Sequence, residues 1–256
     1  MKYRYSFILA LIVTQLFSFA VTQAHDTRTF EIRTYYAAEG KLDDLLARFR
    51  DHTCALFEKH GIENIGYWIP KENPDNKLVY IIAFPDRVEQ KTMWRAFLDD
   101  PDWKAAAKAS TVNGRLVAKI DSLFLDATEY SPRVVTKQNS PNQLFELRTY
   151  KAAEGRLPNL HARFRDHTIA LFDKHGIENL IYMQPQADQE GAADTLIYLV
   201  SHKDEAARKA SFGAFGQDPD WKSARKASEE RAGGGLTVKK GVTFEFLEPT
   251  DFSPMK

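Results

Sequence analysis

The chain is poor in cysteine and carries no net charge. Cys54 is its single cysteine in 256 residues, so an intramolecular disulfide is impossible and the folded state depends on a hydrophobic core. Lysine plus arginine and aspartate plus glutamate each number 35, so the chain as a whole would attract neither nucleic acid nor anionic lipid. We therefore expect no nucleic-acid partner.

A long apolar run occurs only at the start of the chain. Lys2 and Arg4 precede an apolar stretch at 7–21, and Thr22-Gln23-Ala24 follows with a small residue for cleavage. This order is typical of a secretory signal peptide. The alternative is an uncleaved anchor, but a spanning helix needs about 20 apolar residues. We predict a cleaved signal peptide at 1–24, a secreted or periplasmic protein, and no transmembrane segment in the mature chain.

The rest of the chain is a tandem repeat. RFRDHTCALFEKHGIEN at 48–64 returns as RFRDHTIALFDKHGIEN at 163–179, 115 residues later. The DPDWK motif returns after 118 residues, so three residues are inserted, most simply within Gln186–Asp194. A repeat of this length corresponds to a small domain rather than a solenoid unit. We predict domains at 28–133 and 144–254, with a polar linker at 134–143.

Each copy has the pattern of a β-α-β-β-α-β unit. The first strand alternates, with Phe30, Ile32 and Thr34 on one face, and the following helix is stopped by Gly61. In the first copy we predict strands at 30–36, 64–69, 78–84 and 120–125, and helices at 41–60, 87–98 and 101–113. This is the ferredoxin-like α+β motif, whose helices cover one face of the sheet. The middle strands are too apolar for the other face to meet water, so two copies would pack sheet to sheet.

Three motifs carry a resemblance to a known family. FELRTY at 145–150, the helix ending LFxKHG, and DPDW are similar to the NIPSNAP family of the dimeric α+β barrel superfamily, over about residues 30–130 and 145–250. The resemblance implies that two ferredoxin-like units pair their sheets into a barrel. Here both units lie in one chain, so we expect an intramolecular barrel, that is, a monomeric pseudo-dimer, with higher oligomers as a further option.

The pattern Glu-x-Arg-x-Tyr occurs on the first strand of both copies. In the barrel that the resemblance implies, we expect these side chains to line the lumen, with Glu31 paired to Arg33 or to Arg148, because a buried charge is costly unless paired. One interpretation is a structural network that fixes the register of the sheets. The other is a ligand pocket in which arginine holds an acidic or carbonyl oxygen and tyrosine donates a hydrogen bond. The candidate residues are Glu31, Arg33, Tyr35, Glu146, Arg148 and Tyr150.

The helix histidines have structural explanations and one open question. His60 and His175 stand directly before a glycine, where histidine caps a helix. His52 and His167 lie at the border of the apolar stripe and remain candidates for a pocket edge. The Cα atoms of His52 and His60 would be about 12 Å apart along a straight helix, too far for a shared metal, and we expect no metal site.

The remaining motifs also have structural interpretations. The first Asp of DPDW would cap a helix, Trp103 and Trp221 would seal the edge of a core, and Cys54 would act as a small apolar residue, since Ile169 matches it.

Two classes of function remain. The first is an exported protein that binds, or also transforms, a small apolar or aromatic molecule in the lumen; as an enzyme it would resemble the cofactor-independent monooxygenases or isomerases of the superfamily. Haem relatives also exist, with His52, His167 and His202 as ligand candidates by residue type alone, but no haem motif is present and we expect no cofactor. The alternative is a non-catalytic interaction or scaffold module, as the eukaryotic members of the family are regarded.

Overall fold

The computed structural model describes residues 25–136 and 144–256. The predicted signal peptide and most of the predicted linker lie outside the described residues. The first repeat consists of β1 (Thr29–Ala37), α1 (Leu42–Arg48), the π-helical turn η1 (Phe49–Thr53), α2 (Cys54–Lys59), β2 (Glu63–Pro70), β3 (Lys77–Phe84), α3 (Arg87–Asp99), α4 (Pro101–Ser110) and β4 (Val117–Ala127).

The second repeat has the same order of elements. It consists of β5 (Leu144–Ala152), α5 (Leu157–Arg163), η2 (Phe164–Thr168), α6 (Ile169–Lys174), β6 (Glu178–Pro185), β7 (Thr195–His202), α7 (Glu205–Gln217), α8 (Pro219–Arg231) and β8 (Thr237–Pro249). The inserted residues lie in the turn between β6 and β7, as predicted. In each repeat three consecutive elements form one long helix: α1, η1 and α2 in the first, and α5, η2 and α6 in the second. Gly61 and Gly176 end these long helices with φ of +79° and +72°, the left-handed conformation that glycine adopts without strain.

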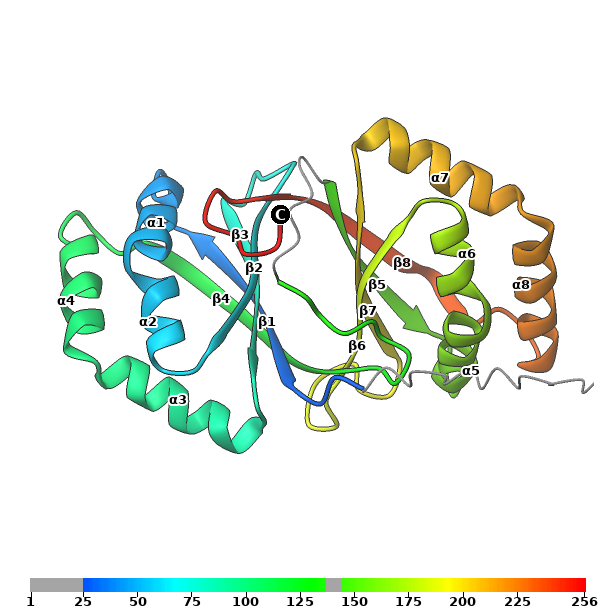
Figure 1. Cartoon of the computed structure of the whole chain (residues 1–256), viewed down its shortest axis with the longest axis horizontal. Coiled ribbons are helices and arrows are strands. Elements are labelled where there is room, and N and C mark those ends of the chain that lie inside the picture. Colours follow the sequence, from blue (N-terminus) through cyan, green and yellow to red (C-terminus); the bar gives the residue numbers. More distant parts are fainter. Residues whose placement is uncertain (1–24, 137–143) are drawn as a thin grey trace, which may run out of the picture.

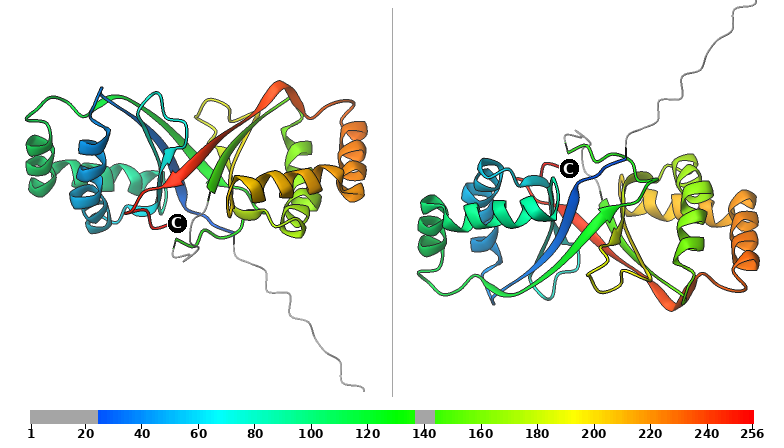
Figure 2. Two further views of the ribbon diagram at one scale, coloured as in Figure 1. Left: turned by 90° about the horizontal axis from the view of Figure 1, so that it is seen from above. Right: turned by 90° about the horizontal axis from the view of Figure 1, so that it is seen from below.

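The eight strands form one closed antiparallel barrel in the order β1-β3-β2-β8-β5-β7-β6-β4. Two seams join the repeats: β2 pairs with β8, where Ile69 lies opposite Glu248, and β4 pairs with β6, where Asp126 lies opposite Gln184. The helices of the two repeats lie on opposite outer sides, with the barrel between them (Figures 1 and 2). The predicted α+β fold with an intramolecular barrel is confirmed.

The barrel interior is apolar, and this corrects the prediction for the Glu-x-Arg-x-Tyr faces. Phe30 and Ile32 of β1 join Phe145 and Leu199 of the second repeat in one buried cluster, and the rings of Trp68 and Phe145 lie 5.4 Å apart. Side chains alternate along a strand, so Glu31, Arg33 and Tyr35, with their partners in the second repeat, point away from the lumen and toward the helices. The alternation was predicted correctly, but the face with Glu31 and Arg33 lies toward the helices and not, as predicted, toward the lumen.

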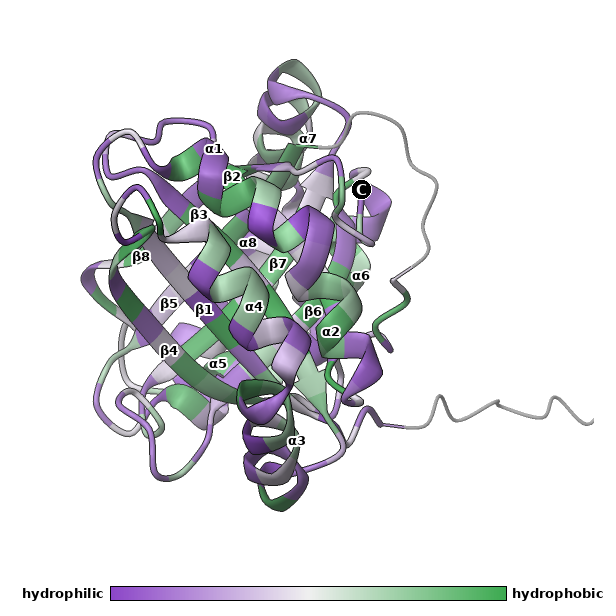
Figure 3. Cartoon of the chain, turned by 90° about the vertical axis from the view of Figure 1, so that its left-hand side faces the viewer, coloured by the Kyte–Doolittle hydropathy of each residue, from purple (hydrophilic) through white to green (hydrophobic). Residues whose placement is uncertain are grey.

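The helices pack on the outer face of each half of the sheet. Leu45, Phe49 and Phe57 from the long helix meet Tyr67 and Tyr80 from the sheet in the first repeat, and an equivalent cluster holds the second repeat together. Figure 3 looks onto the helical side of the first repeat, where hydrophilic and hydrophobic residues mix on the helices in front of the strands. No helix within residues 25–136 and 144–256 has the length and apolarity to span a membrane.

The segment after each repeat crosses to the other repeat. Thr128 N–H donates to the carbonyl of Tyr182 over 2.8 Å, and Tyr182 N–H donates to Ser131 Oγ over 3.0 Å. After β8, Thr250 N–H donates to the carbonyl of Tyr67 over 2.9 Å in the same way. These reciprocal contacts reinforce the two seams of the barrel.

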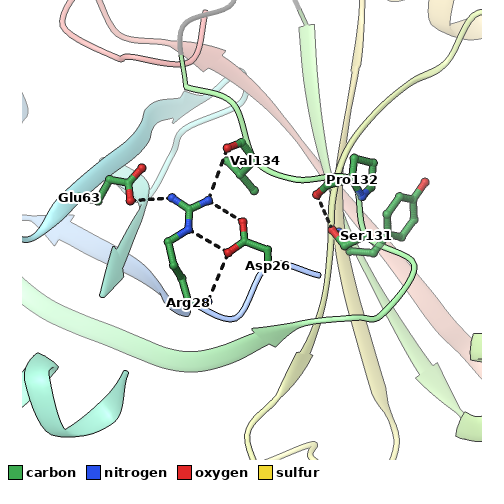
Figure 4. A network of polar contacts seen from close by, with 7 residues as sticks. Asp26, Arg28, Glu63, Ser131, Pro132 and Val134 are labelled. Carbon is green, nitrogen blue, oxygen red and sulfur yellow. Dashed lines mark hydrogen bonds and ion pairs between the residues drawn. The ribbon is translucent and has the colours of Figure 1, made fainter. Parts of the chain in front are cut away.

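Arg28 fastens the start of the first repeat (Figure 4). Its guanidinium donates to both oxygens of Asp26 over 2.9 and 2.6 Å, pairs with Glu63 at 2.6 Å, and reaches the carbonyl of Val134 at 3.4 Å. One side chain thus connects the segment before β1, the start of β2 and the segment that leads toward the second repeat.

Candidate functional site

A cleft of about 430 Å³ lies between the sheet and the helices of the first repeat. Strands β1 and β4 form its floor, and the long helix with α3 and α4 forms its walls. Most of its lining is apolar or aromatic, including Phe49, Phe57, Trp94, Phe97 and Trp103. The polar groups that reach it are Glu31, Arg33, Tyr35, Arg48, Thr53, Gln90 and Ser122.

Glu31 and Arg33 form a hydrogen-bonded ion pair at the floor of this cleft. Glu31 is only 1% exposed, and it also accepts hydrogen bonds from Ser122 Oγ over 2.5 Å and Trp94 Nε1 over 3.3 Å. Arg33 in turn donates from Nε to the hydroxyl of Tyr80 over 2.9 Å. Of the two predicted partners of Glu31, Arg33 is therefore the one that pairs with it, and the carboxylate accepts hydrogen bonds from three donors.

The π-helical turn η1 lies at the wall of the cleft. Thr53 Oγ1 donates to the carbonyl of Arg48 over 3.2 Å, and Thr168 repeats the bond to Arg163 over 3.1 Å in η2. Single π-turns of this kind are frequent at functional sites, and this one brings Arg48, Phe49 and Thr53 into the lining of the cleft. The sequence predicted a uniform helix at 41–60 and missed this turn.

Arg48 has few partners for its charge. Its guanidinium lies over the ring of Trp103 at 5.3 Å, Nη1 reaches Ser110 Oγ only at 3.5 Å, and the buried Nε has no hydrogen-bond partner among the described residues. Burial lowers the pKa of Arg48, but an arginine stays protonated in proteins. Arg48 was not among the residues predicted for a site, although it begins the RFRDHT motif that both copies share.

The second repeat has a matching cleft of about 380 Å³ with different chemistry. There Glu146 accepts from Arg148 and also from Arg208 over 3.0 and 2.9 Å, and His202 Nε2 lies 3.2 Å away. Burial opposes ionisation, but the bonds from His202 and Arg208 and the charge of Arg148 outweigh it and lower the pKa of Glu146 to about 2.

The arginines of the second site have more aromatic and acidic neighbours than those of the first. The register of the strands places Phe244 opposite Arg148 where Ser122 lies opposite Arg33, and the guanidinium of Arg148 lies 5.3 Å from the ring of Phe244. Arg163, which matches Arg48, pairs with Glu229 at 3.8 Å. The two clefts have the same framework, but only the first keeps an arginine without a carboxylate among the described residues.

The structure separates the predicted candidates into two groups. Glu31, Arg33 and Tyr35 gather in the first cleft. Arg148 and Tyr150 line the second cleft, with Glu146 bonded beside them.

The histidines lie elsewhere. His52 and His167 are exposed on the long helices, and His52 borders a separate surface groove of about 330 Å³. His60 and His175 bond the helix-capping Asp100 and Asp218 over 2.6 and 2.7 Å. Both lie at the C-caps of their helices, as predicted, but their rings bond the next helical pair instead of the last carbonyls.

Comparison with known proteins identifies the repeat. The sequence model of the NIPSNAP family matches residues 30–132 and again 145–254. The NipSnap homolog of Dictyostelium discoideum is 22% identical over 143 residues, which span 55% of this chain and 56% of that protein. The match therefore covers about half the length of that relative.

Two solved structures share the whole barrel. One is described as a candidate monooxygenase from Lactobacillus acidophilus, with a TM-score of 0.55 and 12% identity, covering 89% of this chain and 98% of the other. A second candidate monooxygenase, from Fusobacterium nucleatum, has a TM-score of 0.56 and 10% identity, covering 87% of this chain and 92% of the other. At these identities the likeness concerns the fold.

Proposed function

This chain belongs to the NIPSNAP family in two copies, and we propose that it is a binding protein for a small apolar or aromatic molecule held in the cleft of the first repeat. The open, aromatic-lined cleft above the Glu31–Arg33 pair carries this proposal. The proposal moves the ligand from the lumen, where we first expected it, to the space between sheet and helices.

The cleft has the composition of a small-molecule site. Ligand pockets of about 300 to 1,000 Å³ are mostly apolar with a few placed polar groups, and the first cleft, at about 430 Å³, falls in this range. Its polar floor is fixed, because Glu31 and Arg33 bond each other and their neighbours Ser122 and Tyr80. Fixed polar groups favour binding, since they lose little entropy when a ligand arrives.

The difference between the repeats supports the first cleft over the second. Phe244 stands at the strand position of Ser122, and Arg208 stands where the first repeat has Gln90, as the DPDW offset aligns them. These two larger side chains contact each other beside the second cleft, with the guanidinium of Arg208 4.9 Å from the ring of Phe244. We infer that the second cleft keeps a structural role.

Exchange of one residue between the repeats tests this proposal. Benzyl alcohol, naphthalenemethanol and biphenylmethanol are titrated into the full mature chain by calorimetry, with the fluorescence of Trp94 and Trp103 as a second signal. We expect at least one alcohol to bind, and Ser122→Phe to weaken it by about tenfold or more, equivalent to about 1.4 kcal/mol. The matched control Phe244→Ser in the second repeat should leave this binding in place.

Two results would oppose the proposal. If neither these alcohols nor the carboxylic acids with the same rings bind, the interaction or scaffold role becomes the better hypothesis. If Ser122→Phe binds as the unchanged protein does, the ligand lies elsewhere. The proposal names binding and no reaction, because the monooxygenase-like structures resemble this chain only in fold.

We also propose that the chain is exported. The support is the order of charged, apolar and small residues at 1–24. N-terminal sequencing of the protein recovered from the periplasm or medium should begin at His25; an intact Met1 terminus would contradict export by cleavage.

A further inference from the structure

The two repeats differ in the carboxylate beside one matched arginine. In the second repeat Glu229 pairs with Arg163 at 3.8 Å and accepts a hydrogen bond from Arg225 over 3.0 Å. Aligned from DPDW, Thr111 of the first repeat stands at the place of Glu229, and Ala107 at the place of Arg225. The first repeat thus lacks both the carboxylate and its second cation.

No carboxylate elsewhere in the described chain replaces Glu229 beside Arg48. Glu31 is bonded to Arg33, Ser122 and Trp94. Asp44 and Asp51 border the neighbouring groove that Arg48 also reaches, but Asp44 pairs with Lys41 at 2.9 Å, and neither forms an ion pair with Arg48. Residues 1–24 and 137–143 contain no aspartate or glutamate.

The charge of Arg48 therefore has no counterion among residues 25–136 and 144–256. Arg48 shares two features with Arg163: Nε has no acceptor among the described residues, and the guanidinium lies 5.3 Å from the ring of the matching tryptophan. Arg48 differs in that no carboxylate of the described residues forms an ion pair with it, whereas Glu229 pairs with Arg163. Charges taken out of water are as a rule paired, and a guanidinium binds a carboxylate through two parallel hydrogen bonds. The second repeat shows that a carboxylate fits beside the arginine of this framework.

We propose that the ligand of the first cleft carries a carboxylate, which pairs with Arg48 in the place that Glu229 holds in the second repeat. This inference rests on the proposed function of the cleft and adds the chemical class of its ligand, an aromatic or apolar carboxylic acid. The ring system lies among Phe49, Trp94, Phe97 and Trp103, and the acid group reaches the π-helical turn. The Glu31–Arg33 pair stays intact below it.

Matched acids and alcohols test the carboxylate. Benzoate, naphthoate and biphenylcarboxylate are compared with benzyl alcohol, naphthalenemethanol and biphenylmethanol, which have the same rings and lack the charge. We expect the acid to bind the full mature chain at least about tenfold more tightly than its alcohol, with an acid preference that weakens as salt is raised, because the pair is partly exposed. Arg48→Met should abolish the preference, whereas Arg163→Met in the second repeat should retain it.

A second variant keeps the test decisive if Arg48→Met does not fold. Thr111→Glu introduces a carboxylate at the position that aligns with Glu229 of the second repeat. This carboxylate should pair with Arg48, so the protein should no longer bind the acid more tightly than the alcohol. Equal affinity for acid and alcohol in the unchanged protein would overturn this inference and leave the proposed function standing. An acid preference that survives both Arg48→Met and Thr111→Glu would also overturn it. If neither acids nor alcohols bind, the proposed function fails, and this inference fails with it.

Discussion

Arg208 donates hydrogen bonds to both carboxylate oxygens of Glu146, over 3.0 and 2.9 Å. The matching residue of the first repeat is Gln90, which leaves Glu31 with one arginine. Glu146 is fully buried, and its ionised form is favoured only because His202, Arg208 and Arg148 surround it. The second repeat therefore holds its buried carboxylate with one more arginine than the first.

Replacing Arg208 by the residue of the first repeat should destabilise the protein in a pH-dependent way. Arg208→Gln removes two charged hydrogen bonds, and we expect the free energy of unfolding at neutral pH to fall by about 1.5 to 3 kcal/mol. The folded pKa of Glu146, about 2, lies below its ordinary value of 4.5. The stabilisation is therefore complete above pH 4.5 and is lost as the pH falls toward about 2.

Urea unfolding from pH 7 to pH 2 measures this effect. The difference between Arg208→Gln and the unchanged chain should shrink on acidification, whereas the exposed neighbour substitution Lys209→Gln should change little at any pH. A difference of constant size across this range would show that Arg208 acts through packing rather than through the charge of Glu146.

The π-helical turn should matter for binding in the first repeat alone. Thr53→Val keeps the shape of the side chain but removes the hydrogen bond to the carbonyl of Arg48, and we expect a loss of about 1 kcal/mol in stability together with weaker binding of the aromatic acid. Thr168→Val removes the matching bond and should cost similar stability with unchanged binding. Thermal unfolding and calorimetry measure the two effects separately; equal effects of both variants on binding would contradict the assignment of the site to the first repeat.

The Arg28 contacts should stabilise the start of the barrel. Burial opposes ionisation of Asp26, but the hydrogen bonds and charge of Arg28 hold its pKa below the ordinary value, so the pair stabilises the fold at neutral pH and less so in acid. Arg28→Met should lower the free energy of unfolding by about 1 to 3 kcal/mol, because Asp26 is left buried without its donor. A double-mutant cycle with Asp26→Asn measures the coupling; additive effects of the two changes would argue against a direct interaction.

Cys54 should be unreactive in the folded protein. Burial raises the pKa of its thiol to about 12, and only the thiolate attacks a disulfide reagent. We expect no reaction with Ellman's reagent at pH 8 until urea unfolds the chain. Cys54→Ile, the residue of the second copy, should remain folded with near-normal stability; rapid labelling of the native chain would instead reveal an exposed, reactive thiol.

The repeat made the architecture readable from the sequence. Two copies of one β-α-β-β-α-β pattern, each with apolar middle strands such as Leu78–Phe84, predicted that the two sheets pack face to face, and the family resemblance implied that they form a barrel. Most strand bounds were close to those observed. The inserted turn at Gln186–Asp194 was found because the offset between the copies changes there. The ion pair of Glu31 with Arg33 was one of two predicted alternatives, and their spacing of two residues on one strand face explains it.

The side of the sheet that holds the cleft could not be read in the same way. Alternation tells which residues share a face but does not tell which face meets the other repeat. The lumen is buried by both repeats and therefore takes the apolar set of Phe30 and Ile32, whereas the helical side tolerates Glu31 and Arg33 because Trp94, Ser122 and Tyr80 supply partners from distant parts of the chain. The π-helical turn was missed because a prediction that assumes the same number of residues in every turn of the helix does not allow for an extra residue.

Because both halves of the barrel belong to one chain, the residues of each cleft can change independently of the other cleft. In a barrel built from two identical subunits, a mutation that fills one cleft also fills the other, so a mutation that makes the protein more rigid in this way removes both binding sites. Here the exchange of serine for phenylalanine at 244, or of threonine for glutamate at 229, alters one half alone. Gene fusion thus allows one half to specialise as a scaffold under selection for stability while the other remains free to change its ligand.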